Sequence, residues 1–392
     1  MKNVCIIGSG KQGTAAAYDI LLYAKPKKML LLDVSPKALD ICKEKIKNVI
    51  DSKTSIDFKV IDFEDQQSLI KILKDFDIML SAVPYPLNPL LTKIALKSEI
   101  SMVDLGGHTK NVIKQLSYHD QAIEKEITIV PDCGMGPGMN ITMALLAMEY
   151  FDTPEDVFIW DGGLPQNPKP PWNYSLFFNI QGLTNEYDEH AFFIRNGKIV
   201  EVPCFEDIEL LDFDNIGRLE AAVTSGGLST MPWTFEKKLN TLENKTLRYK
   251  GHWSEMIAYR QLGLFDENMI TFKGAHFSPR DFYHHLLKPK LNTGDLNDVC
   301  IMRVDAFGIK NGVRKGIRYD VFEKYDEMTG FMAMEKWTGW HASIVMQKIM
   351  DGSIPHGAYA IESALSGSDF YKEIIKRNYN ISFKEVPARK SC

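Results

Sequence analysis

The first 130 residues alternate between short apolar runs and longer segments in which apolar positions recur with helical spacing. Such runs are typical of strands buried in a parallel sheet, and the amphipathic segments are typical of helices that cover it. The pattern predicts strands at 3–7, 28–33, 57–61, 77–83, 100–104 and 127–131, and helices at 11–23, 35–50, 65–74, 88–97 and 110–124. We therefore expect an α/β domain built on a doubly wound parallel sheet.

After Pro131 the regular alternation of strand and helix ends. An apolar helix is predicted through Met148, and the prolines between Gly162 and Tyr174 favour a rigid, non-helical loop. Two-residue alternation then predicts strands joined by the tight turns that Asn-Gly pairs favour. These strands are expected at Ala191–Arg195, Lys198–Val202, Lys245–Tyr249 and Asp298–Phe307, with Asn-Gly turns at 196–197 and 311–312. The pattern indicates an α+β domain with a mostly antiparallel sheet.

The length of 392 residues favours two domains. Helices predicted near 341–351 and 369–377 are expected to return to the first domain. We therefore predict a dinucleotide-binding domain from 1–132 plus about 340–392, and a substrate-binding and oligomerisation domain from 133–339. The extended sheet of the second domain favours a homodimer or a higher homo-oligomer.

Composition excludes several classes of protein. Hydrophobic residues make up 45% of the chain, charged residues 25%, and the net charge is −5, so no nucleic acid or anionic membrane is expected as a partner. No apolar stretch approaches the length that spans a bilayer, and a predicted strand already begins at residue 3, where a leader would stand. The six scattered cysteines contain no CxxC pair, which favours reduced thiols, no metal and a cytoplasmic location.

A glycine-rich turn follows the first predicted strand. It reads Gly8-Ser9-Gly10-Lys11-Gln12-Gly13, and Asp33 ends the second strand twenty positions later. Strand, glycine triplet, helix, second strand and acid together form the fingerprint of a Rossmann-type dinucleotide site. A carboxylate at Asp33 would accept the ribose hydroxyls and repel a 2′-phosphate, so NAD is the expected cofactor. The alternative is a glycine-rich turn that binds nothing.

The other strand ends of the sheet extend this site, because ligands of such sheets lie beyond the carboxyl ends of the strands. An acid, a glycine pair or a proline turn stands at these ends. The predicted cofactor-binding residues are Gly8, Gly10, Lys11, Gln12, Gly13, Asp33, Val34, Asp62, Ala82, Val83, Pro84, Asp104, Leu105 and Gly106.

Two residues on these loops are candidate catalytic groups. His108 follows a glycine pair and would be a suitable base near neutral pH, or a loop histidine that bonds only to backbone. Asp132 ends the sixth strand, where it would either bind an ammonium group or cap the next helix.

Candidate substrate-binding residues come from the middle of the chain. Arg248 alternates within a predicted strand and is suited to a two-pronged contact with a carboxylate, or it is a solvated strand residue. The remaining candidates are Tyr174, Glu186, Thr224, Ser225 and His252. The pair His284-His285 lacks metal-ligand spacing and is interpreted as structural.

At these residues the chain resembles the saccharopine dehydrogenase-like superfamily and, within it, the lysine 6-dehydrogenases. The resemblance lies in segments spread over residues 1–265 and continues more loosely to residue 345. The matching stretches include Val103–His108, Pro131–Gly134 with Pro137–Met139, Gly162–Pro165, Gly182-Leu183, Ile194–Gly197, Thr224–Gly227 and Lys245–Tyr249 with Gly251-His252. Residues 266–336 depart from the pattern, and Ala358–Glu362 replaces the proline-rich turn usual near the C-terminus.

The resemblance implies NAD-dependent oxidation of the ε-amine of L-lysine to the 6-semialdehyde, which cyclises to a piperideine carboxylate, with release of ammonia. It implies His108 or Asp132 as the base, Arg248 as the carboxylate clamp, and Glu186 or Asp132 as the partner of an amine. The alternatives are a saccharopine-type dehydrogenase acting on a secondary amine, and a non-catalytic NAD-binding regulator.

Overall fold

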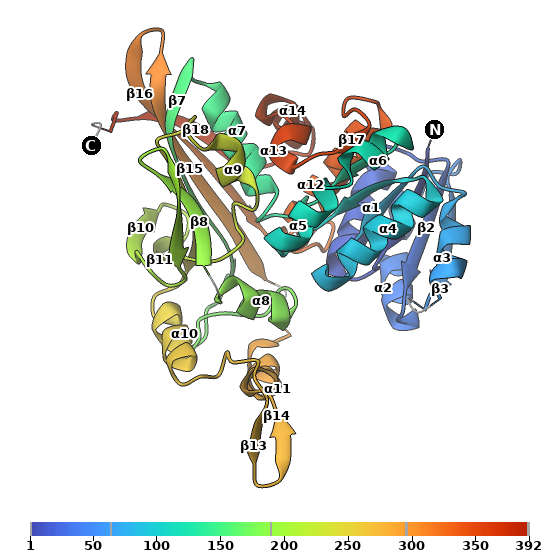
Figure 1. The fold of residues 1–392 in the computed structure, drawn as a ribbon, viewed down its shortest axis with the longest axis horizontal. Helices are drawn as coiled ribbons and strands as arrows, with labels where there is room; N and C mark the ends of the chain where they lie inside the picture. The colour runs from blue at the N-terminus through green and yellow to red at the C-terminus, as the bar shows by residue number, and fades with distance from the viewer. Residues whose placement is uncertain (1, 63–64, 189, 295–296, 390–392) are drawn as a thin grey trace. The chain divides into compact units, whose positions relative to one another are not determined.

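The computed structural model describes residues 2–62, 65–188, 190–294 and 297–389. The chain divides into two compact units, each assembled from three segments (Figure 1). The first unit comprises Met1–Glu149, Ser229–Thr234 and Glu335–Asn378. The second unit comprises Tyr150–Leu228, Phe235–Met334 and Tyr379–Cys392.

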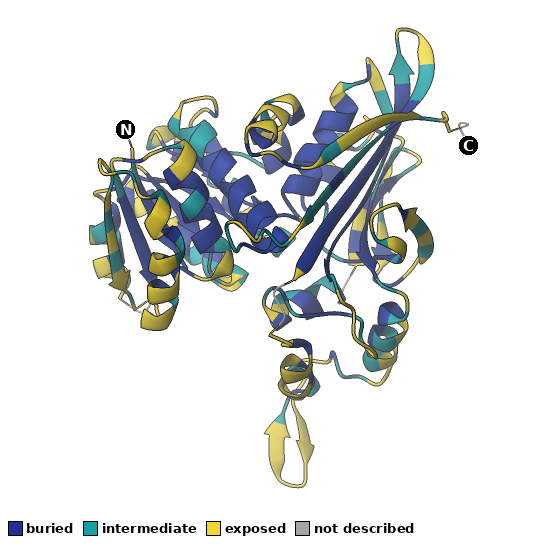
Figure 2. Ribbon diagram, turned by 180° about the vertical axis from the view of Figure 1, so that it is seen from behind, coloured by how far each residue is buried: buried dark blue, intermediate teal, exposed yellow. Residues whose placement is uncertain are grey.

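The first unit is built on a parallel sheet of seven strands in the order β17-β6-β5-β4-β1-β2-β3. Apart from β17, this is the 3-2-1-4-5-6 pattern of a Rossmann fold, with the order reversing between β1 and β4. Most residues of the central strands are buried (Figure 2). The strands are β1 Asn3–Ile7, β2 Lys28–Asp33, β3 Ser55–Val60, β4 Ile78–Ser81, β5 Ser101–Asp104, β6 Thr128–Val130 and β17 Gly357–Ala358.

Helices cover both faces of this sheet. Apolar side chains of α3, α4 and α6 share one buried cluster with strand residues such as Cys5, Leu30 and Met102. On α12, a Cβ added at Gly339 would lie 2.6 Å from the carbonyl oxygen of Gln12, so α12 packs closely on α1. The helices are α1 Lys11–Tyr23, α2 Pro36–Ile46, α3 Gln66–Leu73, α4 Asn88–Ser98, α5 Thr109–Leu116, α6 His119–Glu124, α7 Met139–Glu149, α12 Ala333–Met350, α13 Ile361–Ala364 and α14 Gly367–Lys376, with 3-10 turns η1 Lys47–Val49 and η2 Tyr85–Leu87.

The second unit contains a mixed sheet whose main path runs β10-β11-β12-β7-β15-β16-β18, with β8 paired to β12 and β9. Among the described residues its pairs are antiparallel, except that β7 and β12 run parallel. The strands are β7 Thr153–Pro165, β8 His190–Arg195, β9 Lys198–Pro203, β10 Glu209–Phe213, β11 Gly217–Val223, β12 Thr241–Arg248, β15 Asp298–Lys310, β16 Val313–Lys324 and β18 Ile381–Val386. The predicted fold class is therefore confirmed for both units.

Helices at one end of this sheet enclose an aromatic core that includes Tyr174, Tyr187, Trp253 and Tyr283. A separate two-stranded hairpin, β13 Ile270–Phe272 with β14 Ala275–Phe277, extends from this end (Figure 1). These helices are α8 Ile180–Glu186, α10 His252–Gln261 and α11 Pro279–Leu291. Helix α9 Met231–Phe235 is separate from them, and its first four residues belong to the first unit.

Several element boundaries differ from the sequence-based expectation. The helix expected at 110–124 is interrupted at Ser117-Tyr118, and the helix expected near 341–351 already begins at Ala333. Residues 162–165 were expected in a loop but form the end of strand β7. They can do so because Gly162 and Gly163 have no side chain, which lets neighbouring segments of the protein approach closely. The long middle part also contains β10, β11 and four helices that the pattern did not predict.

The unit boundaries differ from the predicted limits of 132 and 340. Helix α7 remains in the first unit, where Gly367 of α14 packs against Leu146. At the other end of the chain, β18 belongs to the second unit because it pairs with β16. The short segment Ser229–Thr234 also belongs to the first unit, which the sequence did not indicate.

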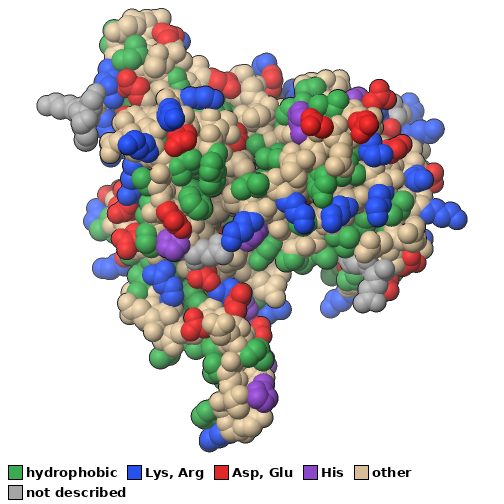
Figure 3. Space-filling view, in the orientation of Figure 1, with side chains coloured by type: hydrophobic (Ala, Val, Ile, Leu, Met, Phe, Trp, Pro, Cys, Tyr) green, Lys and Arg blue, Asp and Glu red, His purple; other side chains and the backbone are tan. Residues whose placement is uncertain are grey.

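The cysteines Cys5, Cys42, Cys133, Cys204 and Cys300 are free and buried, and the predicted thiol at Cys392 lies outside the described residues. Within the described ranges, no group of three or more potential ligands that could hold a metal ion was found. None of the helices seen there has the length and apolar character needed to cross a membrane. Acidic and basic side chains are interspersed on the visible surface of each unit (Figure 3).

Candidate functional site

The glycine turn after β1 has the close packing that a dinucleotide site requires. A Cβ added at Gly13 would lie 1.9 Å from the carbonyl oxygen of Gly8, and one at Gly8, where φ is +99°, would lie 2.4 Å from that of Ala82. At Gly10 a Cβ would meet nothing within 4 Å, and Gly10 caps α1 without a side-chain hydrogen bond. The turn therefore leaves open space and free N–H groups at the positive end of α1, which suits a pyrophosphate.

Asp33 is held rigidly at the end of β2. Its carboxylate accepts hydrogen bonds from the backbone N–H groups of Ser9 (2.7 Å) and Ser35 (2.8 Å), and the residue is half-buried. These bonds fix a negative charge beside the glycine turn. Together with the open space at Gly10, they show that the residues present fit a pyridine dinucleotide.

The other predicted cofactor-binding residues differ in accessibility. Gly8, Gly13 and Asp104 are buried and shape the turn and the strand end. The accessible or half-buried positions are Gly10, Lys11, Gln12, Val34, Asp62, Ala82, Val83, Pro84, Leu105 and Gly106.

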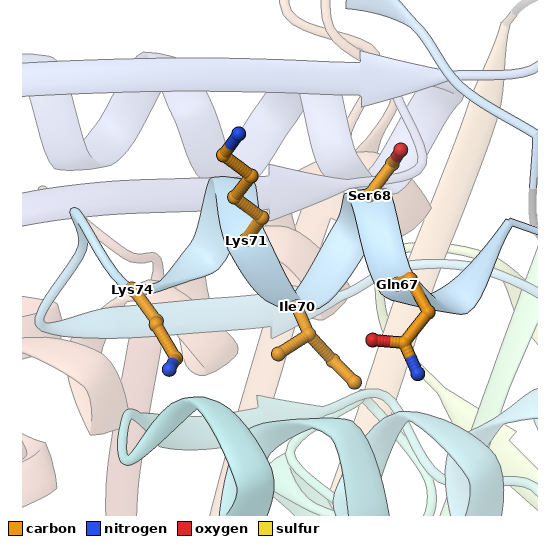
Figure 4. Close-up of a pocket in the computed structure, with 5 residues that line it drawn as sticks. All are labelled: Gln67, Ser68, Ile70, Lys71 and Lys74. Atoms are coloured by element: carbon orange, nitrogen blue, oxygen red, sulfur yellow. The ribbon is translucent and has the colours of Figure 1, made fainter.

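An open depression lies along α3 of the first unit, lined by Gln67, Ser68, Ile70, Lys71 and Lys74 (Figure 4). All of these residues except Ile70 are exposed, and all belong to this helix or its C-terminal cap. The depression includes none of the predicted site residues. We therefore assign no part of the site to it.

The carboxyl group of Asp104 anchors the ends of β5 and β6. Its Oδ1 accepts from the backbone N–H groups of Gly106 (2.8 Å) and Asp132 (3.2 Å), and its Oδ2 accepts from the side chain of Gln115 (2.6 Å). Burial raises the pKa of Asp104, although the bond from Gln115 opposes this. Because these donors occupy both oxygens, Asp104 orients the loop and leaves nucleotide contacts to its neighbours.

Asp132, at the end of β6, is a buried carboxyl group with one of its oxygens engaged by a distant segment. It is 1% exposed, and its backbone has a left-handed φ of +59°. Ser229 donates a hydrogen bond to Oδ2, whereas Oδ1 is buried without a hydrogen-bond partner. Burial, followed by the nearby charge of Asp104, raises the pKa of Asp132 to about 8. A carboxyl group with such a pKa can exchange protons near neutral pH.

His108 precedes α5 and stacks on the ring of Tyr85, with ring centroids 5.5 Å apart. Its Nδ1 is buried and has no hydrogen-bond partner. The structure therefore places the ring against an aromatic side chain and shows no bond to backbone at Nδ1. His108 and Asp132 both keep an unpartnered polar atom at the ends of β5 and β6.

In the second unit, Arg248 is the centre of a buried aromatic cluster. Its side chain is 3% exposed, and its guanidinium carbon lies 4.8 Å from the ring centre of Tyr174 and 5.7 Å from that of Trp253. Nη2 lies 3.5 Å from a carboxylate oxygen of Glu186. The alternative of a solvated strand residue is therefore wrong, because β12 directs Arg248 into this core.

A chain of hydrogen bonds fixes this cluster. His252 Nδ1 lies 3.0 Å from the carbonyl oxygen of Trp172, which can only accept, so Nδ1 carries the proton. His252 Nε2 then accepts from the hydroxyl of Tyr187 (2.8 Å), and that hydroxyl oxygen accepts from Nε of Arg248 (3.0 Å). Burial and the charge of Arg248 lower the pKa of His252 to about 3. His252 is thus a neutral residue that positions Tyr187, with both nitrogens engaged.

Glu186 and Tyr174 carry polar atoms of the cluster that lie outside this series of hydrogen bonds. Burial raises the pKa of Glu186 to about 7; the charge of Arg248 opposes this shift, and Asp161 adds to it. The Tyr174 hydroxyl is buried without a hydrogen-bond partner. A cation, an aromatic hydroxyl and a titratable carboxyl thus converge in one small region, which suits a ligand that carries a carboxylate.

Thr224 and Ser225 have supporting roles in the structure. The hydroxyl of Thr224, which follows β11, lies 2.7 Å from that of Thr246 in β12. The Ser225 hydroxyl donates to the carbonyl oxygen of Asn185 (2.7 Å), and its N–H donates to that of Glu186 (2.9 Å). Ser225 therefore positions the chain that carries Glu186.

Sequence reasoning did not assign several residues that complete these clusters. In the first unit, Ser229 bonds to Asp132, and Thr230 and Thr234 bond to Glu362. His341 contacts the carbonyl oxygen of Cys133 through Nδ1 (2.8 Å). Each partner is far away in the sequence, so no local pattern could reveal these pairs.

Comparison with known protein families identifies both parts of the chain. Residues 4–130 match the saccharopine dehydrogenase NADP binding domain, and residues 134–378 match the saccharopine dehydrogenase C-terminal domain. The second match alone covers more than half of the chain. The chain belongs to the saccharopine dehydrogenase family. Membership of this family confirms the resemblance to the superfamily that the sequence predicted. It also confirms the dehydrogenase class and the presence of a pyridine dinucleotide-binding domain.

Curated relatives are similar at low identity. Mitochondrial alpha-aminoadipic semialdehyde synthase of Mus musculus is 24% identical over 365 residues, which cover 74% of this chain and 38% of the relative. Saccharopine dehydrogenase [NADP(+), L-glutamate-forming] of Schizosaccharomyces pombe is 23% identical over 215 residues, or 52% of this chain and 44% of the relative. The matched regions thus span about two fifths of the length of these two relatives.

A solved structure shares the fold over nearly the whole chain. Apo saccharopine dehydrogenase (L-Glu forming) from Saccharomyces cerevisiae aligns with a TM-score of 0.78 at 17% identity. The alignment covers 99% of this chain and 100% of that structure. This likeness supports the α/β architecture of the family.

Proposed function

We propose that the protein catalyses the NAD-dependent oxidative deamination of the ε-amine of L-lysine, the reaction of lysine 6-dehydrogenases. The observation that carries this proposal is Asp132, a buried carboxyl group with one unpartnered oxygen and a pKa raised to about 8. Such a group suits a substrate that must lose a proton from an ammonium group before it can be oxidised.

The chemistry requires this proton transfer first. An amine with a pKa of about 10.4 is mostly protonated near neutral pH, and the ammonium form has no lone pair to assist loss of a hydride. Asp132 as a carboxylate takes the proton and becomes a neutral carboxyl group. The neutral amine then expels hydride from its carbon and becomes an iminium ion, which water attacks to release ammonia and the aldehyde. A pyridine dinucleotide whose pyrophosphate is held by the glycine turn would supply the hydride acceptor.

The Arg248 cluster supplies the second recognition element. Arg248 is buried and charged, and the unpartnered hydroxyl of Tyr174 lies on the same cluster. We assign both to the α-carboxylate of the substrate and Glu186 to the α-amine. His252 and Tyr187 hold the guanidinium in place. Hydrogen bonds to charged groups contribute about 1.5–3 kcal/mol each, enough to favour an amino acid over a simple amine.

The preference for NAD is part of the same proposal. The fixed carboxylate of Asp33 would repel a 2′-phosphate, although the matching nucleotide domain and the relative from S. pombe carry NADP in their names. The homo-oligomer expected from the sequence also remains a proposal, which light scattering of the purified protein would test.

The deciding experiment is a panel of amino acids and diamines assayed with NAD and with NADP at mildly alkaline pH. We expect NADH formation with L-lysine, release of one ammonia per NADH, and weaker activity with 1,5-diaminopentane. If another amine is turned over and lysine is not, that amine replaces lysine as the assigned substrate.

A saccharopine-type dehydrogenase is the second candidate, supported by the names of the relatives. Saccharopine carries three carboxylates, and the Arg248 cluster contributes one arginine among its described residues. Saccharopine in the same panel separates the two reactions. Nucleotide binding without turnover of any substrate would favour a non-catalytic regulator.

A further inference from the structure

Glu362 is another buried carboxyl group of the first unit, and burial raises its pKa. It lies in the first turn of α13 and is 8% exposed. Its Oε1 accepts hydrogen bonds from the hydroxyls of Thr230 (2.9 Å) and Thr234 (2.7 Å), whereas Oε2 is buried without a partner. This is the same half-satisfied state as that of Asp132.

One short segment connects the two carboxyl groups. Ser229 donates to Asp132, and the next residue, Thr230, donates to Glu362. The two carboxyl groups therefore bond to consecutive residues of one short segment, whose Cα atoms are about 3.8 Å apart. In agreement, the charge of Glu362 raises the pKa of Asp132.

This region lacks a positive charge. Among the described residues, no lysine or arginine forms an ion pair with Asp132, Glu362 or Asp104. The charged groups that act on Asp132 are Asp104 on β5 and Glu362 on α13. Asp104 already accepts hydrogen bonds on both oxygens. A cation would therefore interact with the free oxygens of Asp132 and Glu362.

We propose that Asp132 and Glu362 form a two-carboxylate site for the reacting ammonium group of the substrate, in which Glu362 holds the cation and Asp132 takes its proton. In this proton transfer an ammonium ion and a carboxylate become a neutral amine and a carboxyl group. This inference rests on the proposed deamination. It adds Glu362 as a residue that determines substrate specificity. Glu362 belongs to Ala358–Glu362, the segment that departs from the sequence pattern of the superfamily.

The test uses 1,5-diaminopentane, which carries the ammonium groups of lysine without its carboxylate. Binding to the full-length protein is measured by calorimetry at pH 9, where Asp132 is ionised. We expect Glu362→Gln to weaken binding about tenfold, since one of two charge-assisted contacts is lost. Glu124→Gln on the exposed face of α6 is the matched control and should bind as the wild type does.

A second measurement separates a direct role from a structural one. The titration of Asp132 is followed by infrared difference spectroscopy, with Asp132→Asn identifying its band. Removal of the like charge in Glu362→Gln should lower the midpoint by about half to one pH unit, a three- to tenfold loss of proton affinity. Unchanged diamine binding and an unchanged midpoint in a folded Glu362→Gln protein would overturn the proposal.

If Glu362→Gln fails to fold, Thr230→Val replaces it. Loss of one hydroxyl donor raises the pKa of Glu362, so binding of the diamine should weaken about threefold at pH 7 and recover at pH 9. Equal binding at both pH values would contradict the proposal. Absence of lysine turnover by the wild type would remove the proposed function alone, because diamine binding and the titration do not depend on catalysis.

Discussion

The two units bury carboxyl groups in opposite electrostatic settings. In the second unit, Glu186 lies beside a guanidinium, and its cluster contains aromatic rings that enclose Arg248. In the first unit, Asp132 and Glu362 accept hydrogen bonds from hydroxyls and from backbone N–H groups, and Asp132 lies near a third carboxyl group, Asp104. The cluster around Arg248 thus offers a positive charge to an anionic ligand. The cluster around Asp132 and Glu362 offers negative charge and, among the described residues, contains no cation to balance it.

The largest effect is expected from neutralising the first cluster. Asp132→Asn removes the proton acceptor and keeps the shape, so kcat for lysine should fall by about 10²–10⁴-fold with a smaller change in KM. Steady-state NADH formation measures this, with the exposed Asp40→Asn on α2 as the control. If Asp132→Asn retains activity while His108→Ala loses it, His108 is the base.

A smaller effect should follow from altering the second cluster. Arg248→Lys keeps the charge but loses the Nε donor to Tyr187 and the planar contact with Tyr174. We expect KM for lysine to rise about 10- to 100-fold while kcat changes little. Arg218→Lys, on the exposed pair with Asp212, is the matched control. An unchanged KM in the Arg248 variant would end its assignment as the carboxylate clamp.

The pH dependence of kcat/KM reports on the first cluster. Asp132 accepts a proton only when ionised, and its pKa is raised to about 8. Activity should therefore rise about tenfold per pH unit below 8 and level off above it. A profile that is flat between pH 6 and 9 would show that the proton acceptor has a lower pKa.

The same shift affects stability with a definite sign. A carboxyl group whose pKa is raised by folding binds more protons in the native state, so its contribution is present at low pH and is lost as the pH rises through about 8. Denaturant titrations should show a larger fall in unfolding free energy between pH 4 and 8 for the wild type than for Asp132→Asn. Equal slopes would contradict the raised pKa.

The smallest expected effect concerns the cofactor. Asp33→Ala removes the fixed charge at the end of β2, so the ratio of kcat/KM for NAD over NADP should fall by about tenfold or less. Asp75→Ala, an exposed aspartate after α3, serves as the control. A wild-type preference for NADP would reverse the cofactor assignment from the outset.

The sequence was most informative where function depends on neighbouring residues. The turn from Gly8 to Gly13 and the carboxylate of Asp33 lie within one strand–helix–strand unit, so spacing alone predicts their arrangement. The strand order around β1 follows from the same alternation of elements. The break between α5 and α6 was missed because the apolar pattern continues across it.

The two clusters were harder to predict because they are assembled from distant segments. Arg248 and Glu186 were identified as candidates, but their cluster forms only when Tyr174, the segment Glu186-Tyr187 and the segment from Arg248 to Trp253 come together. The residues that bond to Asp132 and Glu362 come from Ser229–Thr234, about a hundred residues from one and 130 from the other. Nothing in the sequence around Glu362 indicates a buried carboxyl group.

The six residues Ser229–Thr234 have a practical consequence for dividing this protein into fragments. A fragment ending at Glu149 would retain β1, the glycine turn and Asp33, and with them the residues that fit a nucleotide. It would lack the hydroxyls that orient Asp132, as well as α13 with Glu362. Nucleotide binding by such a fragment would therefore say nothing about proton transfer, and protein engineers who exchange nucleotide domains would need to transplant a patchwork of three chain segments.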